Sequence, residues 1–369
     1  MRIAQVAPLY ESVPPVRYGG TERVVSWLTE ELVEAGHDVT LFASGDSRTS
    51  SKLVSCSRRS LRTDSQCRDY LAHHVALVER VAQAAANFDI IHFHIDYLHF
   101  PVSRSEGLCQ ITTLHGRLDL PDLVPVYTEF SSMPVVSISH AQRKPLPWIN
   151  WVGNVHHGLP PKLFSLDSGS GKYLAFLGRI SPEKRPDRAI EIATRLGIPL
   201  KIAAKVDRAD AEYFERAIRH LLDNPLVEFI GEITDAEKQA FLGSALACLM
   251  PIDWPEPFGI NMIEAMACGT PTVAFRHGSV PEIIQHGVNG FVVDDMEQAV
   301  EAVSRVPTLS RKGCRSVFEQ RFTSARMASD YFRIYEAQLQ GDGTFSEISS
   351  QCGRQNQEVC IPTTGAATE

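Results

Sequence analysis

The 369-residue chain lacks a surplus of positive charge, a cysteine framework and any long apolar run. Its formal net charge of −8 argues against sequence-independent nucleic-acid binding, which needs concentrated positive charge. No apolar run approaches the roughly 18 residues that a membrane span needs. The eight cysteines are scattered without a C-x-x-C pair, so we expect neither a zinc site nor disulfides, but free thiols in a reducing cytosol.

Several motifs of catalysis and nucleotide binding are also missing. The sequence holds no D-x-D motif, which fits chemistry that uses no divalent metal. Neither a Walker A loop nor the dinucleotide pattern G-x-G-x-x-G occurs, which argues against P-loop and NAD sites. No His–Cys or G-x-S-x-G arrangement suggests acyl transfer. We therefore expect no cofactor and no metal ligands.

What the chain does contain is a repeated alternation of short apolar runs and helix-like segments, ordinary for a globular protein with 44% hydrophobic residues. This pattern predicts parallel sheets covered by helices, and the length suggests two domains. Prolines and a polar Ser/Gly stretch at 165–171 separate the halves. The expected strands are 2–7, 38–43, 89–94, 110–115 and 135–140, then 173–177, 200–205, 227–230, 247–250, 272–275 and 290–293. The expected helices are 21–35 and 70–87, then 185–196, 209–222, 236–246 and 259–267.

The most informative segment, 255–271, holds two carboxylates eight positions apart. Glu256 precedes a proline-rigid turn, and Glu264 lies one to two turns into the helix that follows. The free N–H groups at the start of such a helix favour an anion. Carboxylates on either side of an anion site suit a ligand with both phosphate and hydroxyl groups, such as a nucleotide sugar.

The segment EPFGINMIEAMACGTPTVAF resembles the E-x7-E signature of retaining, nucleotide-sugar-dependent glycosyltransferases of the GT4 type. The resemblance covers roughly residues 1–338 and implies the α/β GT-B fold, in which two Rossmann-like domains face each other across a cleft. It implies an N-terminal acceptor-binding domain at 1–160, a C-terminal donor-binding domain at 161–321, and a helix at about 322–339 that crosses back to the first domain. The composition of 341–369 predicts a disordered tail.

The resemblance also assigns the charged residues. Arg179 and Lys184, in GRISPEK, match cations that neutralise the leaving diphosphate, and fixed cations there lower the barrier to departure. Glu256 matches the residue that meets the donor sugar near the reacting carbon, and Glu264 matches the residue that binds the ribose hydroxyls. Arg185 is interpreted as solvent-facing. The alternative for the basic segment is an ordinary solvated helix entry.

Backbone groups and neighbouring residues complete the expected donor site. Phe258, Gly259, Ile260 and Asn261 would offer backbone N–H groups to phosphate and sugar. Relatives often carry glycines after the second strand of this half, where this chain has Ala203-Ala204-Lys205. Lys205 is therefore expected to reach a phosphate, and Ile233 to pack on the base.

The first half contributes a glycine-rich loop and a histidine. In the resembled family, the loop of YGGTER, with Gly19 and Gly20, faces the donor diphosphate, although a plain tight turn is the alternative. His115 ends a strand and is placed beside the donor sugar, with a structural histidine as the alternative.

Other polar residues of this half are not assigned to donor binding. The cluster His92, His94 and Asp96 is better explained by shaping the acceptor side than by metal binding. His156 and His157 are interpreted as structural.

These assignments predict a retaining hexosyltransferase that moves a sugar from a nucleoside diphosphate sugar, with UDP expected from family usage. The acceptor would be a sugar, glycolipid or polysaccharide hydroxyl, in polysaccharide or glycolipid assembly. We expect a cytoplasmic protein with peripheral membrane contact if the acceptor is lipid-linked. Arg58, Arg59, Arg62 and Arg68 would form a basic patch there, although a solvated loop is the alternative. A nucleotide-sugar epimerase and a non-catalytic nucleotide-binding protein remain alternatives.

Overall fold

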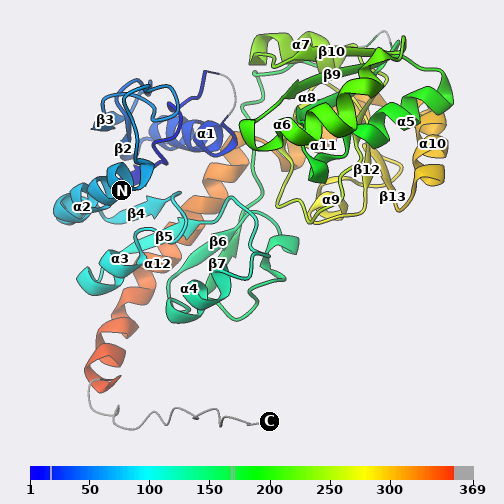
Figure 1. Cartoon of the computed structure of the whole chain (residues 1–369). Helices are drawn as coiled ribbons and strands as arrows, with labels where there is room; N and C mark the ends of the chain where they lie inside the picture. Colours follow the sequence, from blue (N-terminus) through cyan, green and yellow to red (C-terminus); the bar gives the residue numbers. More distant parts are fainter. Residues whose placement is uncertain (17–18, 168, 170, 353–369) are drawn as a thin grey trace, which may run out of the picture.

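The computed structural model describes residues 1–16, 19–167, 169 and 171–352, and they form two lobes that each contain one parallel sheet (Figure 1). The first sheet has the strand order β3-β2-β1-β4-β5-β6-β7, and the second has the order β10-β9-β8-β11-β12-β13. Every pairing within the two sheets is parallel. The predicted α/β class with two Rossmann-like halves is therefore confirmed.

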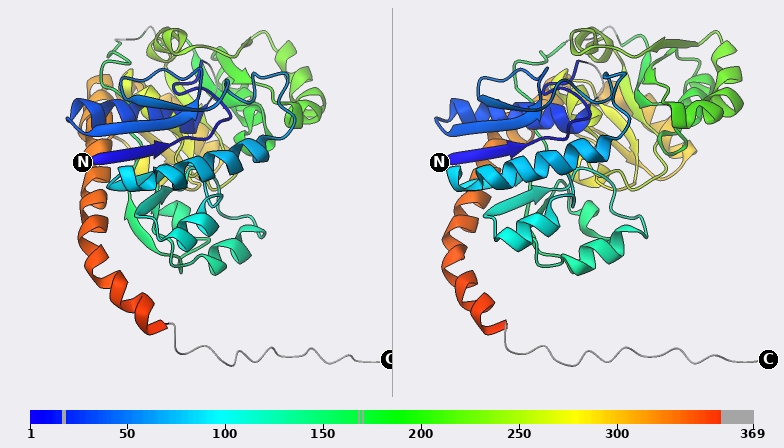
Figure 2. Two further views of the ribbon diagram at one scale, coloured as in Figure 1. Left: turned by 90° about the vertical axis from the view of Figure 1, so that its left-hand side faces the viewer. Right: turned by 60° about the vertical axis from the view of Figure 1, so that its left-hand side comes forward.

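The described part of the first lobe carries strands β1 to β7 and helices α1 to α4, and the helices cover the sheet from both faces (Figure 2). Its sheet extends one strand beyond the expected set at each edge, because β3 and β7 were missed. Both edge strands are only partly buried, so they lack the continuous apolar run that marks a central strand. The elements are β1 (Arg2–Val6), α1 (Gly20–Glu34), β2 (Asp38–Ser44), β3 (Lys52–Ser57), α2 (Tyr70–Ala84), β4 (Ile90–Phe93), α3 (Phe100–Glu106), β5 (Gln110–Thr113), α4 (Leu123–Glu129), β6 (Val135–Ser137) and β7 (Trp151–Asn154).

The second lobe follows the expected strands closely, since its central strands are buried on both faces. The expected helix 209–222 is wrong as one unit. It is divided into α6, a π-helical turn (Phe214–Ile218) and a 3₁₀ segment (Arg219–Asp223). The elements are β8 (Leu174–Arg179), α5 (Pro186–Leu196), β9 (Leu200–Lys205), α6 (Ala211–Tyr213), β10 (Val227–Gly231), α7 (Asp235–Gly243), β11 (Ala247–Met250), α8 (Ile260–Ala267), β12 (Thr272–Phe275), α9 (Val280–Ile283), β13 (Gly290–Val293), α10 (Met296–Arg305) and α11 (Arg311–Arg321).

The chain crosses between the lobes twice, and the two crossings lie side by side. Leu159 donates its N–H to the Phe322 carbonyl at 2.9 Å, and Ser324 donates its N–H to the Leu159 carbonyl at 2.9 Å. A Cβ on Gly158 would lie 2.1 Å from the Thr323 carbonyl oxygen, so this close approach requires glycine. Helix α12 (Ser324–Cys352) then packs against α1 of the first lobe (Figure 1).

Helix α12 matches the expected crossover helix but continues past its expected end at Leu339. Residues 353–369 of the expected tail, and Tyr18 of the glycine-rich loop, lie outside the described residues. Among the described helices, none combines the length and apolar character needed to cross a membrane.

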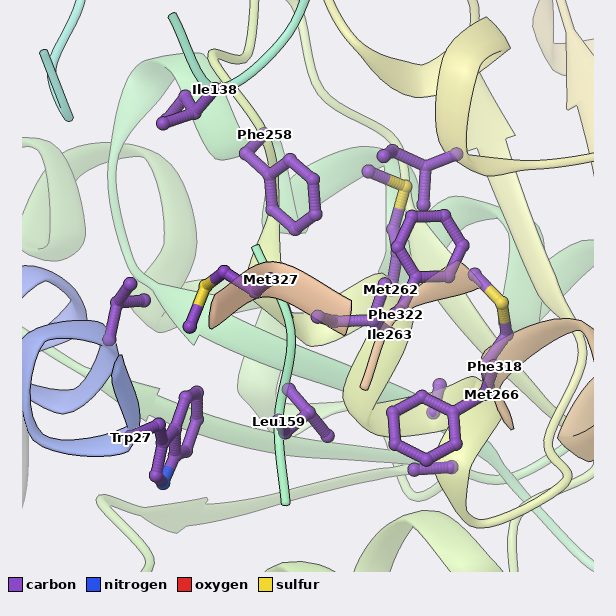
Figure 3. Packing of buried hydrophobic residues seen from close by; sticks show 14 of the residues in the cluster. Trp27, Ile138, Leu159, Phe258, Met262, Ile263, Met266, Phe318, Phe322 and Met327 are labelled. Atoms are coloured by element: carbon purple, nitrogen blue, oxygen red, sulfur yellow. The ribbon is translucent and has the colours of Figure 1, made fainter. Parts of the chain in front are cut away.

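One apolar cluster joins the two lobes around the crossings (Figure 3). Trp27 of α1 and Met327 of α12 lie near Leu159, while Met262 and Phe322 lie on the other side of it. The first turn of α12 and the start of α8 therefore share a core. This shared core fixes the position of the predicted donor-binding helix relative to the first lobe.

Candidate active site

The two lobes enclose a cleft of about 640 Å³, and every residue predicted for catalysis or donor binding lines it, whereas His92, predicted to shape the acceptor side, is buried and does not. In open parallel sheets, ligands bind outside the carboxyl ends of the strands, where the strand order reverses. The first sheet reverses between β1 and β4, and the second between β8 and β11. Arg179 is the last residue of β8, and the segments after the other three strands carry Gly19, Asp96 and Glu256. The cleft is therefore built from the two reversal points.

Glu256 lies on the turn between β11 and α8 and is nearly buried. Its Oε2 atom accepts hydrogen bonds from Lys184 Nζ and, at 3.1 Å, from the Trp254 indole N–H. The Lys184 ammonium also lies 5.0 Å from the Trp254 ring centroid, within the range of a cation–π interaction. The predicted cation and the predicted sugar-binding carboxylate are thus in direct contact.

A loop that the sequence did not single out holds this turn from behind. Ser279 donates its N–H to the Glu256 carbonyl at 2.9 Å and its hydroxyl to the Phe258 carbonyl at 2.8 Å. Gly278 has a φ of 54°, and a Cβ there would lie 2.2 Å from the Glu256 carbonyl oxygen. The Glu256 backbone is therefore fixed by contacts that tolerate only glycine at position 278.

Glu264 lies in α8 with its side chain 4% exposed. Lys238 of α7 donates to its Oε1 atom at 2.6 Å and also lies 3.2 Å from Asp235. Asp235 in turn pairs with Arg23 of α1, in the other lobe. One line of alternating charges thus connects the predicted ribose-binding carboxylate to the opposite wall of the cleft.

The second group of cations lies at the carboxyl edge of β8 and β9. Arg179 and Lys205 are register partners, so both side chains leave the same edge of the sheet. Lys205 Nζ lies 2.8 Å from Asp207, and Arg179 Nη2 donates to Glu183 at 2.8 Å. These carboxylates hold the cations at the cleft, where an anionic ligand would meet them.

The amino end of α8 faces the same space. Gly259 precedes the helix with a φ of 79°, a conformation that favours glycine, and no side chain caps the first turn. Asn261 donates its side-chain amide to the Leu177 carbonyl at 2.9 Å, which ties α8 to the end of β8. Phe258 is buried with its ring 4.8 Å from that of His157. The turn is rigid and leaves backbone N–H groups for an anion.

His115 belongs to a group of three histidine rings at the cleft wall. Its Nε2 atom lies 2.9 Å from His94 Nδ1, and its ring stacks on His157 with centroids 5.3 Å apart. Its Nδ1 atom is buried and has no hydrogen-bond partner within the described residues. Burial lowers the pKa of His115 to about 3, so this ring is neutral at physiological pH.

The interpretation of His157 as only structural is incomplete, because His157 also lines the cleft. His156 pairs with Glu282 at 3.2 Å. The nitrogens of His92 and His94 are taken up by hydrogen bonds. Within the described ranges, no group of three or more His, Cys, Asp or Glu side chains is gathered as for a metal ion.

Asp96 follows β4 and lines the cleft with a φ of 52°, one of two positive values at described non-glycine residues. The surrounding protein raises the pKa of its carboxyl to about 6 by desolvation, although water still reaches the side chain. The other such residue, Arg185, is not simply solvent-facing as expected. It pairs with Asp187 at 2.7 Å and with Asp253 at 2.8 Å.

The glycine-rich loop approaches the donor-side helix across the cleft. A Cβ on Gly20 would lie 3.8 Å from Ile260 Cδ1, so the two walls are close at this point. Gly19 has a φ of 154°, and a Cβ there would lie 2.7 Å from Pro15. Beside them, Glu22 is buried, and burial raises the pKa of its carboxyl.

Among the residues that the geometry brings into or behind the site but that were not predicted from the sequence are Lys238, Trp254, Gly278 and Ser279. Trp254 directly precedes the recognised segment and could have been found by extending it. Lys238 lies on a different helix from its partner Glu264, and only the fold brings them together. Gly278 and Ser279 resemble any turn in sequence.

Comparisons with known proteins agree with this architecture. The family model described as glycosyl transferases group 1 matches residues 164–314, and the model of glycosyltransferase family 4 matches residues 18–157. N-acetyl-alpha-D-glucosaminyl L-malate synthase of Bacillus anthracis is 24% identical over 367 residues, covering 88% of this chain and 95% of that protein. D-inositol 3-phosphate glycosyltransferase of Mycolicibacterium smegmatis is 27% identical, covering 64% of this chain and 53% of that protein.

Solved structures with the same fold include HepE of Anabaena in complex with UDP and glucose. This structure aligns with a TM-score of 0.71 at 18% identity, covering 91% of this chain and all of that chain. AviGT4, a glycosyltransferase involved in avilamycin A biosynthesis, aligns with a TM-score of 0.70 at 23% identity, covering 92% and 98%. The two family matches, the related enzymes and the two-lobed fold give one conclusion: the chain is a sugar-transferring enzyme that belongs to the GT4-type glycosyltransferases of the GT-B fold.

Proposed function

We propose that this enzyme moves a sugar from a nucleoside diphosphate sugar, UDP-linked, to an acceptor hydroxyl with retention of configuration. The observation that carries the proposal is the arrangement of charge in one cleft. Arg179, Lys184 and Lys205 gather beside the open amino end of α8, and Glu264 lies in the same helix. Cations and free N–H groups suit a diphosphate, and a buried carboxylate suits two ribose hydroxyls.

The chemistry follows from where charge develops. As the bond between the sugar C1 and the phosphate oxygen breaks, negative charge grows on the departing diphosphate, and fixed cations stabilise it. The acceptor oxygen forms the new bond to C1 on the same face, and its proton passes to an oxygen of the departing diphosphate. Glu256 holds the sugar hydroxyls, and Lys184, which contacts Glu256, stabilises the neighbouring phosphate. In this proposal the protein cations take the place of a metal.

Features of the two cleft walls support a uridine base and a polyhydroxylated acceptor. UDP is the nucleotide named for the HepE complex, and Ile233 lines the cleft where a base would pack. On the first-lobe side, Tyr10, Tyr97 and the Asp96 carboxylate line the cleft. Aromatic rings and a carboxylate suit a polyhydroxylated acceptor, so we propose a sugar, glycolipid or polysaccharide acceptor, used in cytoplasmic assembly.

Calorimetric titration with UDP, GDP and ADP tests the donor site. We expect one nucleotide to bind and Glu264→Ala and Lys184→Ala each to weaken it about tenfold or more, since hydrogen bonds to charged groups contribute roughly 1.5–3 kcal/mol. Lys201→Ala is a matched control, because Lys201 lies on β9 like Lys205 but pairs with Glu228 outside the cleft.

If none of the three nucleotides binds, the donor-site assignment is wrong. If one binds but no sugar on that base is transferred to any acceptor, the transferase proposal for this site is contradicted. The anomeric proton coupling of the product then decides between retention and inversion.

A further inference from the structure

A chain of buried hydrogen bonds runs from helix α12 to His115, and the proposed function does not account for it. At one end, Tyr335 of α12 is fully buried under the first sheet. At the other end, His115 Nδ1 is buried in the cleft wall without a partner among the described residues. Buried polar atoms are nearly always hydrogen-bonded, so the unsatisfied nitrogen points to a ligand.

The steps next to His115 determine which of its nitrogens carries the proton. Gln5 Oε1 lies 2.8 Å from His94 Nε2, and a carbonyl oxygen only accepts, so His94 Nε2 carries the hydrogen. Burial lowers the pKa of His94 well below its ordinary value, so its ring is neutral and its Nδ1 is a lone pair. That lone pair, 2.9 Å from His115 Nε2, accepts the hydrogen on His115 Nε2. His115 Nδ1 is therefore an unprotonated acceptor.

The contacts beyond Gln5 are compatible with the amide orientation that gives this polarity. Gln5 Nε2 donates to the Tyr335 hydroxyl at 3.1 Å. That hydroxyl is 2.8 Å from His92 Nδ1, and His92 Nε2 is 2.7 Å from the Thr113 hydroxyl. Each of these contacts has one donor and one acceptor when Tyr335 donates to His92. If the Gln5 amide turned over, the polarity of every step to His115 would reverse.

We propose that Tyr335, Gln5 and His94 are positioning residues that keep His115 protonated on Nε2, so that its Nδ1 accepts a hydrogen bond from a hydroxyl of the bound donor sugar. The attribution to the donor sugar rests on the proposed function. The assignment of the His115 tautomer does not depend on the proposed function. The site then selects a sugar with a free hydroxyl at that position, because a deoxy or O-substituted sugar has no hydrogen to give. The returning helix α12 thereby becomes part of the site.

Histidine tautomers can be read directly from long-range ¹⁵N–¹H correlation spectra of the unliganded, ¹⁵N-histidine-labelled enzyme, with His115 assigned by its loss in His115→Gln. We expect the wild-type ring to be the Nε2–H tautomer. Gln5→Met and Tyr335→Phe should convert it to a mixture of tautomers. Tyr173→Phe is the matched control, since it removes a hydroxyl that donates to the Phe241 carbonyl at 2.6 Å outside the cleft, and should change nothing.

A binding experiment separates positioning from a general loss of structure. In both variants, we expect affinity for the intact donor sugar nucleotide to fall about threefold to tenfold, the range for one neutral hydrogen bond. Affinity for the free nucleotide, which has no sugar, should stay unchanged. Melting temperatures identify a variant that fails to fold, and Tyr335→Phe removes only one hydroxyl.

A wild-type His115 protonated on Nδ1, or a tautomer that stays fixed in both variants, would overturn the proposal. Equal losses for donor and free nucleotide would show a structural effect and also overturn it. Failure of the proposed function is distinguishable, because then no nucleotide binds while the tautomer spectra still give their answer.

Discussion

The ion pair between Lys238 and Glu264 provides the sharpest quantitative test of the donor site. Their side chains are 13% and 4% exposed, and Lys238 Nζ lies 2.6 Å from Glu264 Oε1. The substitution Lys238→Met keeps the aliphatic length and removes the charge. It leaves the buried Glu264 carboxylate of α8 without its cation. The perturbation therefore probes the cost of an unpaired buried charge.

The expected magnitude follows from burial. Breaking a buried ion pair by removing one partner costs roughly 3–5 kcal/mol. Lys238 reaches the edge of the cleft, so water enters on deletion, and we expect a smaller cost of about 2–3 kcal/mol. Asp235 keeps its partner Arg23, so it adds little. Adding Glu264→Gln removes the unpaired charge, and the double variant should recover at least about half of the loss.

Thermal or denaturant unfolding at pH 7.5 of the wild type, both single variants and the double variant forms a double-mutant cycle. A loss of about 2–3 kcal/mol in the free energy of unfolding of the second lobe corresponds to a decrease of roughly 5–10 °C in melting temperature. The reasoning is refuted if Lys238→Met melts with the wild type, or if the two substitutions are additive. The two proteins in which Glu264 is replaced should also bind nucleotide more weakly than the two that retain it.

Three further outcomes are expected. Gly278→Ala places a Cβ within 2.2 Å of the Glu256 carbonyl oxygen, so turnover should fall more than about tenfold. Gly287 also has a positive φ but has open space around it, so Gly287→Ala should alter stability only. Equal activities of the two variants would contradict this prediction. Asp96→Asn should raise the melting temperature at pH 8 but not at pH 4, because a raised carboxyl pKa of about 6 means stability lost as pH rises from about 4 through 6. Since the pKa of His115 is lowered to about 3, His115 should not titrate between pH 5 and 8. The pH–rate profile of His115→Gln should therefore have the same shape as that of the wild type in this range.

Much of the site was predictable from sequence because its residues sit where short motifs meet strand ends. Arg179 closes β8, and Glu256 and Glu264 flank the start of α8, so local sequence fixes their places. The strands of the second lobe were equally clear, since β11, β12 and β13 are buried throughout. The edge strands β3 and β7 are only partly buried, so they lack the continuous apolar run that marks a buried strand.

The remaining features depend on contacts between distant segments. Lys238 and Glu264 are on different helices, and the glycine at 278 matters only because its loop packs on the Glu256 backbone. The histidine network joins Gln5 to a residue 330 positions later in the chain. Neither spacing nor periodicity contains such information.

The paired crossings at Leu159 and Thr323 have a mechanical consequence. We expect two covalent connections that run side by side, hydrogen-bonded to each other, to oppose sliding and twisting of the lobes. They leave rotation about one axis through the pair as the softest motion. In such a hinge rotation, residues near the axis move little and residues far from it move more. The Arg23–Asp235 ion pair then connects the two lobes across the cleft, and its strength should influence how often the cleft opens.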